Sequence, residues 1–237
     1  MTASVTAALV TAGVLGVTHA IEPDHVAGIS SLTSEHGDSR LSALAGACFS
    51  LGHVALVVAW LAVGYLLLGQ TEFDAVFDAV GTLGVGLVLG LLGASMAVGG
   101  LRRVVRTDEH DHGDHSHSHP HVHLPVPGFD GHDHDTVSYL KTGLVGALLT
   151  LSPPVSMIVF SSTLVPDYGA TVVAMAVVTY GVTITVTMSL LGAGAGALFG
   201  LTRERGVAFH GAAQLVAGLA IVGLAVSLLL TATPTRL

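Results

Sequence analysis

The chain has 237 residues, of which 51% are hydrophobic and only 10% are charged, and its mean hydropathy is +0.75. Soluble domains carry about 25% charged residues, so this composition excludes an ordinary soluble globular protein. The net charge of −8 argues against a nucleic-acid partner, and the single cysteine excludes an internal disulfide. Uncharged stretches of about 20 residues predict helices that span a lipid bilayer.

Six apolar spans follow one another along the chain and predict an all-α, polytopic membrane protein. They cover residues 3–20 with a short helical piece at 24–34, then 41–69, 79–100, 139–165, 170–200 and 208–231. The first span has no basic leader, so we expect it to be retained rather than removed as a secretory signal. Seven of the eight Lys and Arg residues flank the spans on one side. The positive-inside rule makes that side cytoplasmic and leaves both termini outside the plasma membrane.

The two halves of the chain resemble each other at an offset of about 130 residues. Gly13, Gly16 and Pro23 align with Gly143, Gly146 and Pro153, and Leu51-Gly52-His53 aligns with Tyr180-Gly181-Val182. Chance likeness between glycine-rich helices is the alternative. A true repeat with three helices per half would be inverted, as in many secondary transporters, with the first and fourth helices broken near the midplane. The predicted units are a first repeat at 1–106, a loop at 107–136 and a second repeat at 137–237.

Ionisable residues gather at the end of the first span, where a membrane tolerates few of them. His19, Glu22, Asp24 and His25 surround Pro23. On a continuous helix these side chains would point apart, but proline breaks the helix and lets them converge. Imidazole and carboxylate groups bind divalent transition metals. We therefore predict metal ligands at His19, Asp24 and His25, with Glu22 as an additional metal or proton site. A plain proline kink at the interface is the alternative.

His53 lies in the middle of the second span and is predicted to complete the metal site, with Ser50 orienting its ring. A simple hydrogen bond between helices is the other interpretation. The fourth span is broken at the repeat-related place by Pro153 and Pro154. Nearby hydroxyl groups would line the opposite wall of the pathway or merely accompany a kink. They belong to Thr150, Ser152 and Ser156.

The middle loop is rich in histidine and predicts a second, flexible metal-binding segment. Its nine histidines are His110, His112, His115, His117, His119, His121, His123, His132 and His134. Imidazoles interleaved with aspartates bind Ni²⁺, Co²⁺, Zn²⁺ or Cu²⁺. On the cytoplasmic face the loop would concentrate, buffer or sense metal.

The pattern His19-x4-Asp24-His25, followed by Leu51-Gly52-His53, resembles the nickel/cobalt transporter superfamily. The likeness is strongest over about residues 10–60 and includes urease-accessory-like and nickel/cobalt efflux relatives. It implies transport rather than catalysis, with the His-x4-Asp-His motif as the metal site. Uptake members have Arg where this chain has Thr18, and Asp-Ala where it has Glu22-Pro23. Efflux members tend to have Gly in place of Asp24.

We expect a transporter of Ni²⁺ or Co²⁺, with Zn²⁺ as an alternative substrate and no cofactor. The membrane potential drives a divalent cation inward without a coupling ion, which favours uptake; efflux by proton antiport is the alternative. An intramembrane zinc metalloenzyme using the same ligands, and a membrane-tethered metal buffer acting through the loop, are rival interpretations. The expected partners are the lipid bilayer and divalent metal ions, and the helices are compatible with a homo-oligomer.

Overall fold

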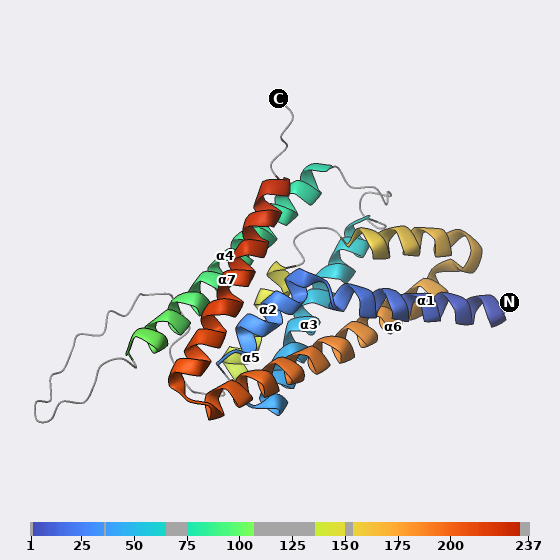
Figure 1. Cartoon of the computed structure of the whole chain (residues 1–237). Coiled ribbons are helices and arrows are strands. Elements are labelled where there is room, and N and C mark those ends of the chain that lie inside the picture. The colour runs from blue at the N-terminus through green and yellow to red at the C-terminus, as the bar shows by residue number, and fades with distance from the viewer. Residues whose placement is uncertain (1, 36, 65–74, 107–135, 150–153, 233–237) are drawn as a thin grey trace, which may run out of the picture.

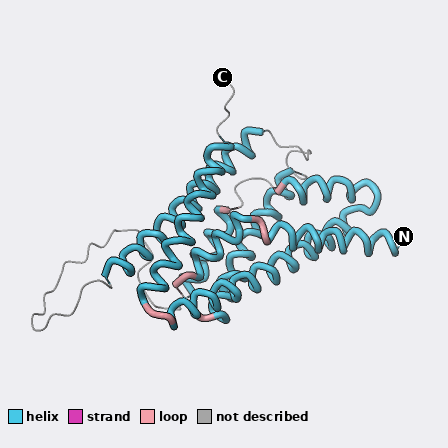
Figure 2. Tube along the Cα trace, viewed as in Figure 1, coloured by secondary structure: helices cyan, strands magenta, loops and turns pink. Residues whose placement is uncertain are grey.

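Every element in the described part of the chain is a helix, as the composition predicts (Figure 2). The computed structural model describes residues 2–35, 37–64, 75–106, 136–149 and 154–232. The helices are α1 Thr2–Ala20, α2 Pro23–Thr33, α3 Ser39–Ala62, α4 Ala75–Arg106, α5 Thr136–Leu148, α6 Val155–Glu204 and α7 Val207–Ala232. The all-helical prediction is therefore confirmed for these residues.

Four of the described helices, α3, α4, α6 and α7, are long and apolar enough to cross a membrane. The pair α1 and α2 passes the same test as one span bent by 58°. Many large apolar side chains on these helices face outward, among them Leu91, Leu190 and Leu230 at 68–74% exposure. Such a surface suits lipid rather than water. The chain is a multi-pass membrane protein.

The helix labelled α6 is two helices joined by a sharp turn (Figure 1). Gly169 has φ 72° and ψ 177°, a conformation that side chains larger than hydrogen rarely adopt. A straight helix of 50 residues would be about 75 Å long, more than twice the bilayer core. The chain instead turns at Gly169, so residues 155–168 and 170–204 form two helical segments, and their assignment to the predicted spans 139–165 and 170–200 stays a prediction.

Two groups of helices make up the bundle. Helix α4 lies along α7 over most of its length, and the two form a pair at one side of the molecule (Figure 1). Their axes approach closely because Gly93 faces the backbone of Gly218, and Gly100 faces that of Gly211. Small residues at facing positions let membrane helices pack backbone to backbone. The second group contains α1, α3, α5 and α6, and α2 lies between the two groups, touching both.

In the second group, α1 packs on α6 and α5 packs on α3, again through glycine. A Cβ atom at Gly16 would lie 2.8 Å from the carbonyl oxygen of Tyr180. A Cβ atom at Gly146 would lie 2.7 Å from the carbonyl carbon of Phe49. Gly16 and Gly146 are the glycines that the 130-residue offset aligns. Two positions that this offset aligns thus make the same kind of close backbone contact.

Candidate metal centre

The first span breaks where the sequence places Pro23. Helix α1 ends at Ala20, and α2 starts at Pro23 with Glu22 as its N-cap residue. Glu22 has φ −59° and ψ 145°, the extended conformation imposed on a residue before proline. The amide of Glu22 still donates to the carbonyl of His19 at 3.1 Å, and the Glu22 carbonyl accepts from Val26 at 3.1 Å. The break is therefore a tight corner, and it turns the end of α1 toward the start of α2.

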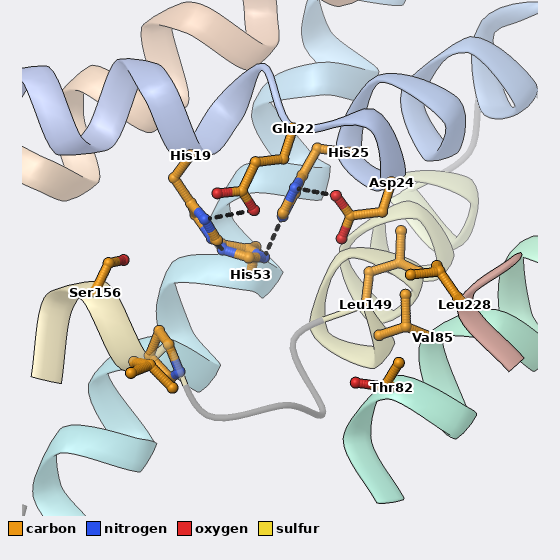
Figure 3. A pocket seen from close by; sticks show the side chains of 12 residues that line it. His19, Glu22, Asp24, His25, His53, Thr82, Val85, Leu149, Ser156 and Leu228 are labelled. Carbon is orange, nitrogen blue, oxygen red and sulfur yellow. Dashed lines mark hydrogen bonds and ion pairs between the residues drawn. The ribbon is translucent and has the colours of Figure 1, made fainter. Parts of the chain in front are cut away.

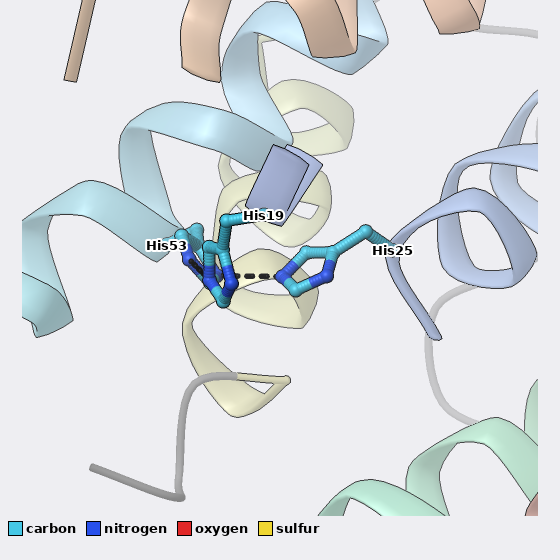
Figure 4. A group of neighbouring side chains, drawn as sticks. All are labelled: His19, His25 and His53. Carbon is cyan, nitrogen blue, oxygen red and sulfur yellow. Dashed lines mark hydrogen bonds between the residues drawn. The ribbon is translucent and has the colours of Figure 1, made fainter. Parts of the chain in front are cut away.

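Three imidazoles meet at this corner (Figure 4). Nε2 of His19 lies 3.0 Å from Nε2 of His53, and Nε2 of His25 lies 3.3 Å from Nδ1 of His53. One ring nitrogen from each histidine falls within 4.8 Å of those of the other two. His25 and His53 are each only 1% exposed. The structure brings together the histidines that the sequence predicts as ligands, from α1, α2 and α3.

Each of the two outer histidines also contacts a carboxylate (Figure 3). Nδ1 of His19 lies 3.0 Å from Oε2 of Glu22, and Nδ1 of His25 lies 3.1 Å from Oδ1 of Asp24. A carboxylate only accepts, so Nδ1 of His25 is the donor in its hydrogen bond to Asp24, whereas His19 and Glu22 form an ion-pair contact. The lone pair of a neutral His25 ring is then on Nε2, the nitrogen that faces His53. Glu22 is half exposed, whereas the Asp24 side chain is 23% exposed.

The cluster opens into a pocket whose other walls come from distant parts of the chain (Figure 3). Besides the three histidines, Glu22 and Asp24, it is lined by Thr82 and Val85 of α4, Leu149 after α5, Pro154, Val155 and Ser156 at the start of α6, and Leu228 of α7. These walls are mainly apolar. The polar face of the pocket is the histidine–carboxylate cluster itself.

Two aromatic side chains that local sequence patterns do not predict lie against the imidazoles. The ring of Tyr180 stacks on that of His19 with 6.1 Å between centroids, and Phe49 meets His25 edge-on at 6.3 Å. Both aromatic residues are fully buried. Tyr180 was visible in the sequence only as part of the frame that aligns with Leu51-Gly52-His53. Burial against these rings limits the orientations that the imidazoles adopt.

The remaining predicted site residues have different surroundings. The hydroxyl of Ser50 lies 2.9 Å from that of Thr185 on α6, so its hydrogen bond joins α3 to α6, and its expected role in orienting His53 stays a prediction. Ser156 and Pro154 do line the pocket. Thr150, Ser152 and Pro153, like the whole histidine-rich loop, lie outside the described residues.

The sequence matches the profile of the NicO family, described as "High-affinity nickel-transport protein", over residues 5–144. The match covers more than half of the chain and includes His19, Asp24, His25 and His53. The chain belongs to this family. Searches of curated proteins and of solved structures find no match. Membership of the NicO family implies nickel transport, and it agrees with the resemblance carried by the His-x4-Asp-His pattern. The histidine cluster of this NicO protein lies in the matched part of the chain.

Proposed function

We propose that this NicO protein is a secondary transporter that moves Ni²⁺ or Co²⁺ across the plasma membrane, with His19, His25 and His53 as ligands of the transported ion. The observation that carries the proposal is the convergence of three buried imidazoles at a helix break. An ionisable cluster inside a membrane protein marks an ion pathway by default. Imidazole suits nickel, cobalt and zinc.

The spacing of the ring nitrogens supports this ligand set. Two nitrogens bound to one metal at about 2.1 Å are separated by about 3.0 Å in an octahedral shell and about 3.4 Å in a tetrahedral one. The separation of 3.0 Å to Nε2 of His53 and that of 3.3 Å to Nδ1 of His53 each fall in this range. His53 faces its neighbours through different nitrogens, so a turn of its ring is needed to present one of them to the ion. The metal then replaces the direct contacts among the three rings.

The two carboxylates support the site through the histidines. The hydrogen bond from Nδ1 of His25 to Asp24 fixes the tautomer that leaves Nε2 of His25 free for a metal, and Glu22 lies in ion-pair contact with Nδ1 of His19. The two negative charges of these carboxylates also balance a divalent cation held away from bulk water. We therefore propose that Asp24, expected from the sequence as a direct ligand, acts in this conformation by orienting His25. The ligand atoms of Glu22, Asp24 and His25 also lie within 4.8 Å of one another, so these three residues form a second group that could hold an ion.

An inverted repeat with six spans is part of this proposal. The aligned glycines Gly16 and Gly146 each pack against the backbone of a helix from the other half, which supports a two-fold relation between residues 1–106 and 137–237. In such folds, transport occurs when one group of helices rocks against the other around a midplane site. Here the pair α4 and α7 forms one wall of the pocket, and α1, α2 and α3 carry the cluster.

We propose uptake as the direction, with both termini outside and the histidine-rich loop in the cytoplasm. A charge that crosses 100 mV gains about 2.3 kcal/mol, so a divalent ion gains about 4.6 kcal/mol, more than three decades of concentration. Inward transport then needs no coupling ion, whereas efflux needs one.

The test is the flux of radiolabelled Ni²⁺ into liposomes that contain the purified protein. An inside-negative potassium diffusion potential is applied without a pH gradient. We expect saturable accumulation that depends on the potential and is inhibited by Co²⁺. Absence of saturable flux under any gradient would overturn the proposal. Flux that follows only an imposed pH gradient would instead favour proton antiport.

A further inference from the structure

A second polar cluster lies at the far end of α2 from the metal centre. It consists of Glu35, in the turn after α2, with Arg103 of α4, Arg203 of α6 and Gln214 of α7. We call these four residues the arginine clasp. They come from four separate segments, and nothing in the histidine cluster requires them. Their contacts join the end of α2 to both groups of helices.

Glu35 is the centre of the clasp. Its carboxylate accepts from Arg103 at both oxygens, with Nη1 to Oε1 at 3.0 Å and Nη2 to Oε2 at 2.7 Å. Arg203 places Nη2 3.6 Å from Oε2 and also donates to the backbone carbonyl of Glu35. The bidentate pair with Arg103 fixes the carboxylate in one plane, a geometry that lysine does not offer.

Gln214 ties this ion pair to the interior. Its side chain is 1% exposed, and its amide donates to Oε1 of Glu35 at 3.0 Å and to the carbonyl of Ser34 at 3.4 Å. The amide oxygen accepts from Arg103. A buried amide is costly unless it is hydrogen-bonded, so Gln214 favours the conformation in which Glu35 and Arg103 are both in place. The clasp is therefore one connected network.

Electrostatics agree with this geometry. Burial alone raises the pKa of the Glu35 carboxyl, but the hydrogen bonds and charge of Arg103, with Gln214 and Arg203, outweigh it and leave the pKa below its ordinary value. The carboxylate form is thus the one that the clasp binds.

The clasp and the pocket lie on opposite sides of the metal centre. The pocket is lined by Thr82, Val85 and Leu228, which lie toward the Ala75 end of α4 and the Ala232 end of α7. Arg103 and Gln214 lie toward the other ends of the same two helices. Between them, the hydroxyl of Ser31 on α2 donates to the carbonyl of Leu92 on α4 at 3.4 Å. The pocket thus opens the metal centre at the Pro23 end of α2, and the arginine clasp covers it at the Thr33 end.

We propose that the arginine clasp is a gate of the metal pathway. It lies on the side where α4 ends at Arg106 and α7 begins at Val207. It holds α2 against α4 and α7 and has to open for the ion to leave toward that side. This inference rests on the proposed transport function. Helix α2 links the gate to the metal centre, because it carries Asp24 and His25 in its first turn and Glu35 follows its last turn. Movement at the clasped end is therefore transmitted to two residues of the metal centre.

The exposure of the clasp fits a gate that opens in every cycle. The side chains of Glu35 and Arg103 are 56% and 31% exposed, so water and salt screen their attraction. A partly exposed ion pair of this kind contributes little to stability, so opening it in each cycle costs little.

The experiment measures how fast a thiol placed behind the clasp reacts. Cys48, the only cysteine of the sequence, is replaced by alanine, and Ser31→Cys introduces the reporter. The full-length protein in lipid nanodiscs is treated with a neutral, water-soluble maleimide. Glu35→Gln and Arg103→Gln are each expected to raise the modification rate about tenfold, and the double variant no more than either single one, because both break the same network.

Arg102→Gln is the matched control. It removes the same charge from the same turn of α4, but Arg102 is exposed. We expect its modification rate to stay at the parent value. If a glutamine variant does not fold, Arg103→Lys keeps the charge without the bidentate geometry and should give a smaller rise. Raising the salt concentration should also accelerate modification in the parent protein but not in Glu35→Gln.

Equal rates in the parent and in both glutamine variants, with no effect of salt, would overturn the gate. That outcome is distinct from failure of the proposed function. The thiol reaction needs no metal, whereas the function fails only if the parent protein gives no Ni²⁺ flux in liposomes.

Discussion

Nδ1 of His25 lies 3.1 Å from Oδ1 of Asp24, the residue immediately before it at the start of α2. The contact joins neighbours in the sequence, and it depends on the corner at Pro23 because α2 begins there. It directs Nε2 of His25 at His53. The two residues of the Asp-His pair are thus in hydrogen-bond contact, and we propose that the carboxylate orients the imidazole.

The first prediction concerns this pair. Asp24→Asn keeps an acceptor beside His25 but removes the charge, and Asp24→Ala removes both. We expect Ni²⁺ affinity to fall by about tenfold for the first change and by up to about a hundredfold for the second. Isothermal titration calorimetry on protein lacking residues 108–135 measures both, since that deletion removes the competing loop histidines.

Asp167→Asn is the control for this series, because Asp167 is an exposed aspartate near the turn of α6. The Ni²⁺ affinity of Asp167→Asn should equal that of the parent protein. Parent-like affinity in Asp24→Ala would show that the carboxylate has no part in binding.

A second prediction tests the packing of the repeat-related glycines. Gly16→Ala and Gly146→Ala each push a methyl group against the backbone of a neighbouring helix. We expect each to lower the free energy of unfolding by about 1–3 kcal/mol. Thermal unfolding in detergent is the measurement. Gly194→Ala, where no atom lies within 4 Å of the added Cβ, should leave stability unchanged or raise it slightly. Equal behaviour of all three variants would count against the close packing.

The third prediction separates the transporter from a metal buffer. Deletion of residues 108–135 removes nine histidines, and with them most of the metal-binding groups outside the cluster. A transporter that uses His19, His25 and His53 keeps a substantial part of its Ni²⁺ flux. A buffer that acts through the loop loses its function altogether. Flux and total bound metal, measured on the same liposomes, distinguish the two.

The fourth prediction is a pH dependence from Glu35. The pKa of this carboxyl is lowered in the folded protein, chiefly against the effect of burial, by Arg103 with Gln214 and Arg203. A lowered pKa adds stability that is complete above the unfolded value of about 4.3 and is lost as the pH falls through the folded value. Because Glu35 is more than half exposed, we expect the gain to stay within about 1 kcal/mol.

The stability difference between the parent and Glu35→Gln should therefore be constant from about pH 8 to pH 5 and shrink below about pH 4. Unfolding in detergent across this range measures it. A difference that changes near neutral pH would point to another group, and His210, which lies near Arg203, is the one to replace next.

Much of this arrangement follows from local sequence rules. Pro23 predicts the break because proline excludes the helical conformation at Glu22, and histidine and acid beside it predict a metal site. Tyr180, Thr82 and Leu228 could not be predicted as its surroundings, because they approach the site only through the packing of α4, α6 and α7. The arginine clasp was missed for the same reason. In the sequence, Arg103 and Arg203 look like ordinary basic residues that flank membrane spans. No local pattern pairs either of them with Glu35.

The role of Asp24 shows a subtler limit. Spacing indicates that a carboxylate and two imidazoles are near each other, but it does not say which of them faces the ion. That depends on ring orientation, to which the hydrogen bond from His25 to Asp24 and the contacts from Phe49 and Tyr180 all contribute.

The central claim is that the transported ion passes through the three-histidine cluster, and Ni²⁺ counterflow in proteoliposomes tests it most directly. The decisive pair is His53→Ala and His210→Ala, two buried histidines of which only the first belongs to the cluster. The account predicts that His53→Ala loses nearly all counterflow while His210→Ala retains it. Counterflow in His53→Ala equal to that of the parent protein would contradict the account.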